Sequence, residues 1–454
     1  MQKNENVKKS DLKKQLLRQF FPDLNPLIEK RLLNEFEDQN KEFFGKKSAN
    51  NHNRLSIADS ELFRKIVMLI KKEEKIGFSD TNFTMLMKEL ATSLELITSN
   101  RGNNLLHYFV LNNDLYAVKF LIDSGFNPHL TNMTLENALF IAINNDVDNR
   151  IIEYLIQSYP KLLFDLNLYN VNAYELAYQK NSFNYVKLVI ETFCKANNLT
   201  IEESGLIDYM FISEKSPLHY AVESNNLTLV EYLLANKAKV IIFDNYKRIP
   251  LHYACITGNS KILELLLLNA PTKKDVFFQD RGKQTPIELA LQNLNDERIN
   301  NVLEIFIKLR KNNTINFIHG NYGSLLHLCI VYNNPKALEF ILENYYNYFK
   351  KYINMPVNEY YITPLTLAIA NNNYKIASVL LKYGANIKVK DNKKNTLLHL
   401  AAKLNNIDIC KLLIENGIDV NATNVYGDTA DKMTNSEEIK RLFAFVRSFT
   451  RKVN

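Results

Sequence analysis

Histidine is the residue type whose placement in this chain most suggests chemistry, because imidazole rings bind metals and carry protons near neutral pH. Five of the eight histidines are the fourth residue of a short recurring opening: His107, His219, His252, His327 and His399. Neighbouring members of this row, such as His219 and His252, lie 33 residues apart. This wide spacing matches none of the close histidine and cysteine spacings of a zinc site. We therefore expect the row to be structural and expect no metal.

The cysteines and the other candidate motifs also point away from catalysis. Four cysteines lie far apart, without the spacing of a metal or redox pair: Cys194, Cys255, Cys329 and Cys410. Such a set is typical of free, buried thiols in a reducing compartment. No serine or cysteine nucleophile has a recognisable base partner, and no phosphate-binding glycine loop is present. The sequence thus predicts a protein that is not an enzyme, with no catalytic residues and no cofactor.

The openings that contain the histidines recur along most of the chain. Four of the nine intervals between openings are 33 residues, and the longer intervals indicate insertions in loops. Repetition at a fixed step of this length indicates a solenoid of stacked repeats. The openings begin at Asn104, Asn137, Asn172, Ser216, Ile249, Thr285, Ser324, Thr363, Thr396 and Thr429.

Each opening is followed by two helical stretches. A Ser, Thr or Asn at the start caps the first helix by accepting a backbone N–H, and a proline after it suits the first turn. The second stretch carries apolar residues at i, i+3 and i+4, as in Val230, Leu233 and Leu234. Glycines then occupy the left-handed position that ends such a helix: Gly125, Gly384 and Gly417.

The two most regular openings carry a family resemblance. Residues 216–221 read Ser-Pro-Leu-His-Tyr-Ala, and residues 249–254 read Ile-Pro-Leu-His-Tyr-Ala. From Asn100 to the C-terminus the chain resembles the ankyrin-repeat family, whose repeat of about 33 residues carries a Thr-Pro-Leu-His-x-Ala signature. The resemblance implies an all-α solenoid of about nine or ten helical hairpins. It also implies that the histidines hydrogen-bond near the helix starts and tie neighbouring repeats together, and that a concave groove binds a protein partner.

The segments outside the repeats predict the domain organisation. We expect an N-terminal helical capping segment or small helical domain over 1–100, the solenoid over 101–436, and a C-terminal capping helix and tail over 437–454. An alternative for 437–452 is a basic amphipathic helix that contacts a membrane surface. Two insertions are expected to lengthen individual repeats, one over residues 197–211 and one over residues 345–361.

Exposed positions in the loops between repeats predict a binding surface. The family resemblance implies that the residue three positions before each opening faces the groove, and tyrosine recurs there. Tyrosine is enriched at binding hot spots because it offers a large area with few rotamers. A second row of candidates lies at the end of each first helix. The predicted partner-binding residues are Tyr169, Tyr246, Tyr322, Tyr332, Tyr360, Tyr361, Lys393, Leu404 and Tyr426.

Charge and hydropathy narrow the class of partner and the compartment. The net charge of +7 comes from 56 basic and 49 acidic residues that are mixed throughout, so no nucleic-acid partner is expected. No apolar run reaches the length of about 18 residues that a membrane span needs, so no integral membrane association is expected. Residues 1–10 are too polar for a secretory signal peptide. These features predict a soluble protein of a reducing, cytoplasmic-type compartment.

Composition also suggests a biological setting. The chain is rich in Asn, Lys, Ile and Tyr and lacks Trp, a bias typical of an AT-rich genome. With its unrelated N-terminal segment, it looks similar to the ankyrin-repeat effectors that Legionella-like intracellular bacteria inject into host cells. This resemblance implies a virulence protein that is exported without a signal peptide into a host cytoplasm and binds a host protein.

Two alternatives place the function in residues 1–100. Residues 16–33, with the sequence Phe-Pro-Asp-Leu over 21–24, resemble an F-box helix pair. That resemblance implies an adaptor that recruits a ubiquitin-ligase scaffold. The other alternative is an N-terminal catalytic domain of an unrecognised kind, although this segment contains one histidine, His52, and no cysteine.

Overall fold

The computed structural model describes residues 14–22, 29, 57–94, 101–270, 278–294, 296–310, 324–357 and 362–450. The chain divides into two compact units, residues 1–238 and 239–454. The described residues form helices and loops without a β-strand, and the extended stretches between repeats make only isolated bridges such as Lys390 with Thr396. The all-α class expected from the sequence is therefore confirmed for these residues.

The recurring openings start the first helix of every repeat. Each of the ten predicted openings is the N-cap of a helix, with extended backbone at the cap residue. Where the cap is asparagine, its side chain accepts the N–H of the third helical residue, as Asn137 does from Phe140 at 2.8 Å. This local bond explains why a polar residue in the sequence marks the boundary.

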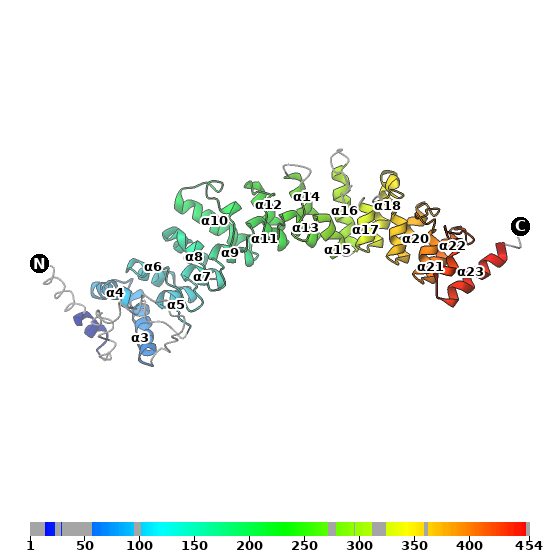
Figure 1. The fold of residues 1–454 in the computed structure, drawn as a ribbon. Helices are drawn as coiled ribbons and strands as arrows, with labels where there is room; N and C mark the ends of the chain where they lie inside the picture. The colour runs from blue at the N-terminus through cyan, green and yellow to red at the C-terminus, as the bar shows by residue number, and fades with distance from the viewer. Residues whose placement is uncertain are drawn as a thin grey trace. The chain divides into compact units, whose positions relative to one another are not determined.

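In the first unit, paired short helices stack in two rows (Figure 1). The helices α5, α7, α9 and α11 pack side by side in one row, and α6, α8 and α10 pack side by side in the other. The elements are α3 (Ile57–Glu74), α4 (Thr81–Leu94), α5 (Leu105–Leu111), α6 (Leu115–Asp123), α7 (Ala138–Asn144), α8 (Asn149–Ser158), η1 (Pro160–Phe164), α9 (Ala173–Gln179), α10 (Phe183–Asn197), η2 (Leu206–Asp208), α11 (Pro217–Glu223) and α12 (Leu227–Ala235).

The second unit repeats this arrangement. The helices α13, α15, α17, α19 and α21 form one row, and α14, α16, α18, α20 and α22 form the other. The elements are α13 (Pro250–Thr257), α14 (Ser260–Leu268), α15 (Pro286–Asn293), α16 (Asp296–Arg310), α17 (Leu325–Val331), α18 (Pro335–Phe349), η4 (Lys350–Tyr352), α19 (Pro364–Ala370), α20 (Tyr374–Lys382), α21 (Leu397–Lys403), α22 (Ile407–Glu415), η5 (Ala430–Met433) and α23 (Glu437–Thr450).

The core lies between the two rows of helices. In α12, Leu229, Val230 and Leu233 are buried, whereas Leu234, expected in the apolar stripe, is only half-buried. The stripe is therefore rotated toward Leu229 from the position expected from the sequence. The expected helix-ending glycines are confirmed, because Gly125, Gly384 and Gly417 all have positive φ.

The row of histidines holds the repeats together. His252 is buried, and its Nδ1 accepts the backbone N–H of Ile249 at 3.1 Å. Its Nε2 lies 3.1 Å from the carbonyl oxygen of Phe278, in the loop that leads to the next repeat, and so donates to it. His107 and His399 make the same pair of bonds. The structural role expected for this row is confirmed at these positions.

Asparagine dominates the turn between the two helices of a repeat. One residue of this turn has a left-handed backbone, which asparagine tolerates better than other residues with a β-carbon. Its φ lies between 51° and 58° at Asn113, Asn181, Asn225, Asn333, Asn372 and Asn405.

A second asparagine in these turns links one repeat to the previous one. The Oδ1 of Asn373 caps its own helix by accepting the N–H of Ile376 at 3.1 Å, and its Nδ2 donates to Asn333 Oδ1 of the preceding repeat. Asn406 likewise donates to Asn372 at 2.6 Å. Because this position must donate and accept at once, an amide suits it, whereas an ionised Asp side chain can only accept. Part of the asparagine content therefore has a structural reason.

Both predicted insertions lengthen a second helix. α10 continues to Asn197 and is followed by a turn and η2, and α18 continues to Phe349 with a kink at Tyr345. Residues 358–361 of the second insertion lie outside the described residues. The lengthening of these repeats is confirmed as far as the structure describes them.

Helices lie against the first and last repeats. Phe78, in the turn before α4, stacks on Phe120 of α6 with ring centroids 4.0 Å apart. At the other end α23 packs on α22 and η5, with Ile439 and Phe443 buried. Arg447 of α23 also pairs with Asp431 at 2.7 Å. These contacts suit capping roles, and the domain boundaries at 100 and 437 stay predictions.

Candidate functional site

In several loops that join successive repeats, the predicted residue lies at the tip of a turn that is held by an Asp or Asn side chain. In the loop before α13, Asp244 Oδ1 accepts the backbone N–H of Tyr246 at 2.9 Å and that of Arg248 at 2.8 Å. This turn, in which an Asp or Asn side chain accepts backbone N–H groups two and four residues ahead, places the residue two positions on at the loop tip. Asn167, Asp391 and Asn424 make equivalent turns. We call the residues at these four tips the tip residues: Tyr169, Tyr246, Lys393 and Tyr426.

The tip residues are exposed and held in place. The exposed fractions of the tyrosines are 72% for Tyr169, 55% for Tyr246 and 68% for Tyr426, and Lys393 is also exposed. Backbone hydrogen bonds join neighbouring loops, such as Val425 N–H to Lys393 O at 2.9 Å. The tips of adjacent repeats within a unit therefore form a fixed row.

Tyr246 has further support from its surroundings. The Arg248 guanidinium lies 5.7 Å from the centre of the Tyr246 ring, within the range of a cation–π interaction. Arg248 Nε donates to Asp280 Oδ2 at 3.0 Å, and Tyr253 Oη donates to Asp244 Oδ2 at 2.5 Å. These bonds fix the base of the loop and leave the ring of Tyr246 free to contact another molecule.

The second predicted row is only partly exposed. Leu404, after α21, and Val331, at the end of α17, are 38% and 42% exposed. Tyr332 is half-buried as the C-cap of α17, so it offers less surface than expected. Three further predicted residues lie outside the described residues: Tyr322, Tyr360 and Tyr361. Tyr169 belongs to the first unit, and the other described site residues belong to the second.

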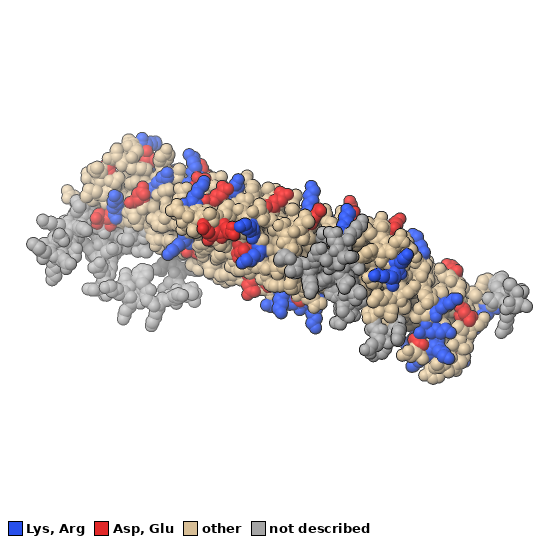
Figure 2. Space-filling view, turned by 90° about the horizontal axis from the view of Figure 1, so that it is seen from above, with Lys and Arg blue, Asp and Glu red and all other residues tan. Residues whose placement is uncertain are grey.

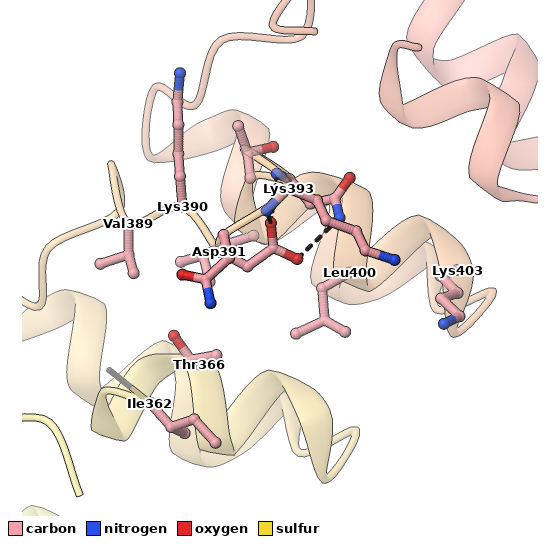
Figure 3. A pocket seen from close by; sticks show the side chains of 12 residues that line it. Ile362, Thr366, Val389, Lys390, Asp391, Lys393, Leu400 and Lys403 are labelled. Carbon is pink, nitrogen blue, oxygen red and sulfur yellow. Dashed lines mark hydrogen bonds between the residues drawn. The ribbon is translucent and has the colours of Figure 1, made fainter. Parts of the chain in front are cut away.

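One cavity in the second unit gathers residues from two adjacent repeats (Figure 3). It has a volume of about 540 Å³ and lies between α19, α21 and the loop over residues 389–395. It brings the predicted Lys393 together with residues that were not among the predicted sites. These are Ile362, Thr366, Val389, Lys390, Leu400 and Lys403.

The sequence carries a local signal for the tips besides the tyrosines themselves. An Asp or Asn stands two positions before each tip residue, at Asn167, Asp244, Asp391 and Asn424. The cavity had no such signal, because its lining comes from two segments that are more than 20 residues apart in the chain.

The buried titratable groups of the repeats are not arranged for catalysis. Burial lowers the pKa of His107 and of His327 to about 4, so these rings are neutral near pH 7. Burial also raises the pKa of the thiols of Cys255 and Cys329, and that of Cys410 to about 12. Thiols with such pKa values are protonated and poorly nucleophilic. Among the residues that the structure describes, no three His, Cys, Asp or Glu side chains cluster in a way that could hold a metal ion.

The N-terminal segment that resembles an F-box is described only in part. Leu16, Leu17 and Phe21 are buried, and Phe20 packs edge-on against Phe83 of α4 with ring centroids 5.6 Å apart. These side chains thus serve the core of the first unit. Of residues 16–33, the structure describes 16–22 and 29.

Charged side chains are interspersed on the face of the molecule in Figure 2, with Lys and Arg beside Asp and Glu. In the part of the chain that the structure describes, no helix combines the length and the apolar composition that crossing a bilayer requires.

Stacked helical hairpins with ordered, projecting loops define a repeat protein of the helical solenoid class. A model of the family "Ankyrin repeats (3 copies)" matches residues 106–202, 177–280 and 326–424, which together make up more than half of the chain. The chain belongs to the ankyrin-repeat family. Ankyrin repeats generally mediate protein–protein interaction and are usually not enzymes.

Individual relatives match over part of their length. Alpha-latrotoxin-Lg1a of Latrodectus geometricus is 27% identical over 143 residues, which are 31% of this chain and 10% of the toxin. Protein fem-1 homolog C of Homo sapiens is 30% identical over 134 residues, or 26% of this chain and 21% of that protein. The crystal structure of the ankyrin-repeat domain of Bcl-3 is 23% identical, with a TM-score of 0.42, covering 51% of this chain and 98% of that domain. The chain thus spans 10% and 21% of the length of these two curated relatives.

Proposed function

We propose that this chain is a non-enzymatic scaffold that binds a partner protein through its tip residues and through the neighbouring ends of the first helices. The observation that carries the proposal is that exposed tyrosines occupy several ordered loop tips: Tyr169 in the first unit, and Tyr246 and Tyr426 in the second. An ordered aromatic side chain loses little conformational entropy on binding, which favours its use as an anchor. The Asp and Asn turns and the bonds between loops hold these side chains in place before a partner arrives.

The tip tyrosines contribute little to folding. Substitution of exposed side chains away from special features changes stability by about 0.5 kcal/mol or less. Truncation of a binding hot spot costs about 2 kcal/mol or more, which is about 30-fold in Kd. If a tip tyrosine is only an exposed side chain, its substitution should change neither stability nor affinity by much. If it is a binding hot spot, the same substitution should weaken binding and leave stability nearly unchanged.

The test compares the double variant Tyr246→Ala/Tyr426→Ala with the wild type. A partner isolated from a cell lysate by the immobilised chain is purified, and its Kd is measured by calorimetry. We expect a loss of about 30-fold or more in affinity for the double variant with an unchanged thermal midpoint. Tyr116→Ala, at a side chain that is 72% exposed on α6, is the control and should change neither quantity. Equal affinity of the double variant and the wild type would refute the proposal.

The finer hypothesis concerns the biological setting. The proposal includes a host protein as the partner and export of the chain as a virulence effector of an intracellular bacterium. The composition of the chain and its resemblance to ankyrin-repeat effectors support the bacterial setting, whereas the relatives described above are animal proteins. A translocation reporter fused to the chain, in bacteria with and without a functional secretion apparatus, tests it. A reporter signal that is the same in both strains would refute export.

A further inference from the structure

The cavity in the second unit combines an apolar wall with a basic rim. Ile362, Val389 and Leu400 are half-buried and point toward the open space together with Thr366 (Figure 3). In the same view Lys393 extends over Leu400 toward Lys403. Both lysines are exposed and both line the cavity. A molecule that entered this space would meet apolar surface below and ammonium groups at the edge.

Among the described residues at this place, lysines outnumber acids. The loop over 388–394 carries four lysines and one acid, Asp391. The Asp391 carboxylate accepts hydrogen bonds from its own turn, including Asn395 Nδ2 at 2.8 Å, so it shapes the loop. Within the described part of the second unit, the lysines that line the cavity make no ion pair.

Other lysines of the same unit behave differently. Lys382 pairs with Glu339 at 3.1 Å, and Lys432 pairs with Asp428 at 2.9 Å. Among the described residues, Lys390, Lys393 and Lys403 differ from these two lysines in having no such pair, and unlike the unpaired lysines elsewhere in the unit they lie around one cavity. Their charge is available to a ligand.

Resting on the proposed function, we propose that this cavity binds an extended acidic segment of the partner protein. One apolar side chain of the segment packs against Ile362, Val389 and Leu400, and an adjacent Asp or Glu carboxylate pairs with Lys393 and Lys403. A volume of about 540 Å³ lies within the range of about 300–1,000 Å³ of sites that enclose small ligands, so it can hold one or two side chains. The positive charge of Lys393 and Lys403 is complementary to a carboxylate. The apolar wall favours a segment in which an apolar side chain lies next to that carboxylate.

Nucleic acid is the less suitable occupant. A nucleic-acid surface generally shows lysines and arginines clustered along one face. Here Asp391 lies within the basic loop, and acidic and basic side chains are interspersed on the face in Figure 2. Nucleic acid is therefore treated as an outcome of the experiment.

The experiment is a peptide selection with the full chain as the target. A displayed library of random twelve-residue peptides is selected on the wild type and on Lys393→Glu/Lys403→Glu. The control is Lys261→Glu/Lys411→Glu, which makes the same change in net charge at exposed residues of α14 and α22. Because all four lysines are exposed, both double variants should keep the thermal midpoint of the wild type.

We expect the wild type and the control to enrich peptides with Asp or Glu next to a Leu, Ile or Phe. A synthetic peptide of this kind should bind the cavity variant about tenfold more weakly or worse, and added salt should weaken its binding to the wild type. A second peptide, with Lys in place of the acidic residues, should prefer the cavity variant.

Several results would overturn the inference. One is that the wild type enriches no acidic peptides, and another is that the acidic peptide binds both double variants with equal affinity. A third is that binding of a single-stranded RNA oligonucleotide depends on Lys393 and Lys403 while binding of the peptides does not. Peptides that bind independently of these lysines but require Tyr246 and Tyr426 would refute the acidic segment and leave the scaffold proposal intact. Peptides that require Lys393 and Lys403 but not the tyrosines would support this inference and contradict the role of the tip tyrosines.

Discussion

Replacement of His252 by leucine tests whether the histidine row holds the repeats together. Leucine has a similar volume but makes no hydrogen bond, so the substitution leaves the N–H of Ile249 and the carbonyl of Phe278 without their partner. Ile249 is 1% exposed, and an unsatisfied buried group costs about 1–3 kcal/mol. Phe278 is half-buried, so water can reach its carbonyl more easily and the loss there is about 1 kcal/mol.

The summed loss of unfolding free energy for His252→Leu is about 2–4 kcal/mol. For a unit of this size that corresponds to a thermal midpoint about 5–12 °C lower. Urea denaturation of the full chain followed by circular dichroism measures the loss. Hydrogen exchange reports whether the loss is concentrated in α13 and α15, which the bond connects.

A matched control uses a histidine outside the row. His129 pairs with Asp165 at 2.8 Å, and its side chain is 37% exposed. His129→Leu should therefore change stability by about 1 kcal/mol or less. A loss below about 1 kcal/mol for His252→Leu, or a loss no larger than that of the control, would refute the structural role argued for the row.

The remaining predictions concern pH and backbone conformation. Because burial lowers the pKa of His107 and His327 to about 4, the unfolded chain binds protons between about pH 6.5 and 4 that the folded chain does not, and stability falls as the pH falls through this window. Each of these histidines can contribute a loss of up to about 3 kcal/mol, and a urea midpoint at pH 4.5 equal to or above that at pH 7 would contradict the expectation. Gly258→Ala should be more damaging than Gly384→Ala, because both glycines have positive φ but only the new β-carbon at 258 would meet another atom, Leu294 Cδ2 at 2.9 Å. We expect losses of about 2–3 and about 1 kcal/mol in the same assay, and equal losses would show that the contact relaxes freely.

The repeat pattern could be predicted because its signals are local. Helix caps such as Asn137 and helix-ending glycines such as Gly384 act within a few residues of their own position. Their spacing in the sequence therefore maps directly onto the boundaries of the helices. Ile249 has no side-chain oxygen to act as a cap, so only the match of its neighbours to the repeat predicts this boundary; its own N–H donates to His252 Nδ1, as at the other caps followed by histidine.

The surface was harder to predict because exposure depends on neighbouring repeats. Tyr332 and Leu404 are equivalent C-cap residues, of α17 and α21, yet Tyr332 is half-buried and Leu404 is exposed. The Asp and Asn turns before the tips were readable in principle, since the acceptor lies two residues away. The basic rim could not be predicted from the sequence, because Lys393 and Lys403 line the same cavity only once the loop and α21 are packed together.

The asparagine hydrogen bonds that link the helix turns of successive repeats have a consequence for how such a chain can gain or lose repeats. Each of these repeats brings one oxygen for the neighbour that follows and one NH₂ group for the neighbour that precedes it, as Asn372 and Asn406 show. Duplication or deletion of a whole repeat by recombination therefore leaves no amide mismatched at the new junction. At the end of the array Thr434 supplies a hydroxyl to Asn405 at 2.6 Å, which closes the series. Gain or loss of a repeat would therefore preserve the asparagine hydrogen bonds between neighbouring repeats. The loop tips take no part in these bonds and can change independently of them.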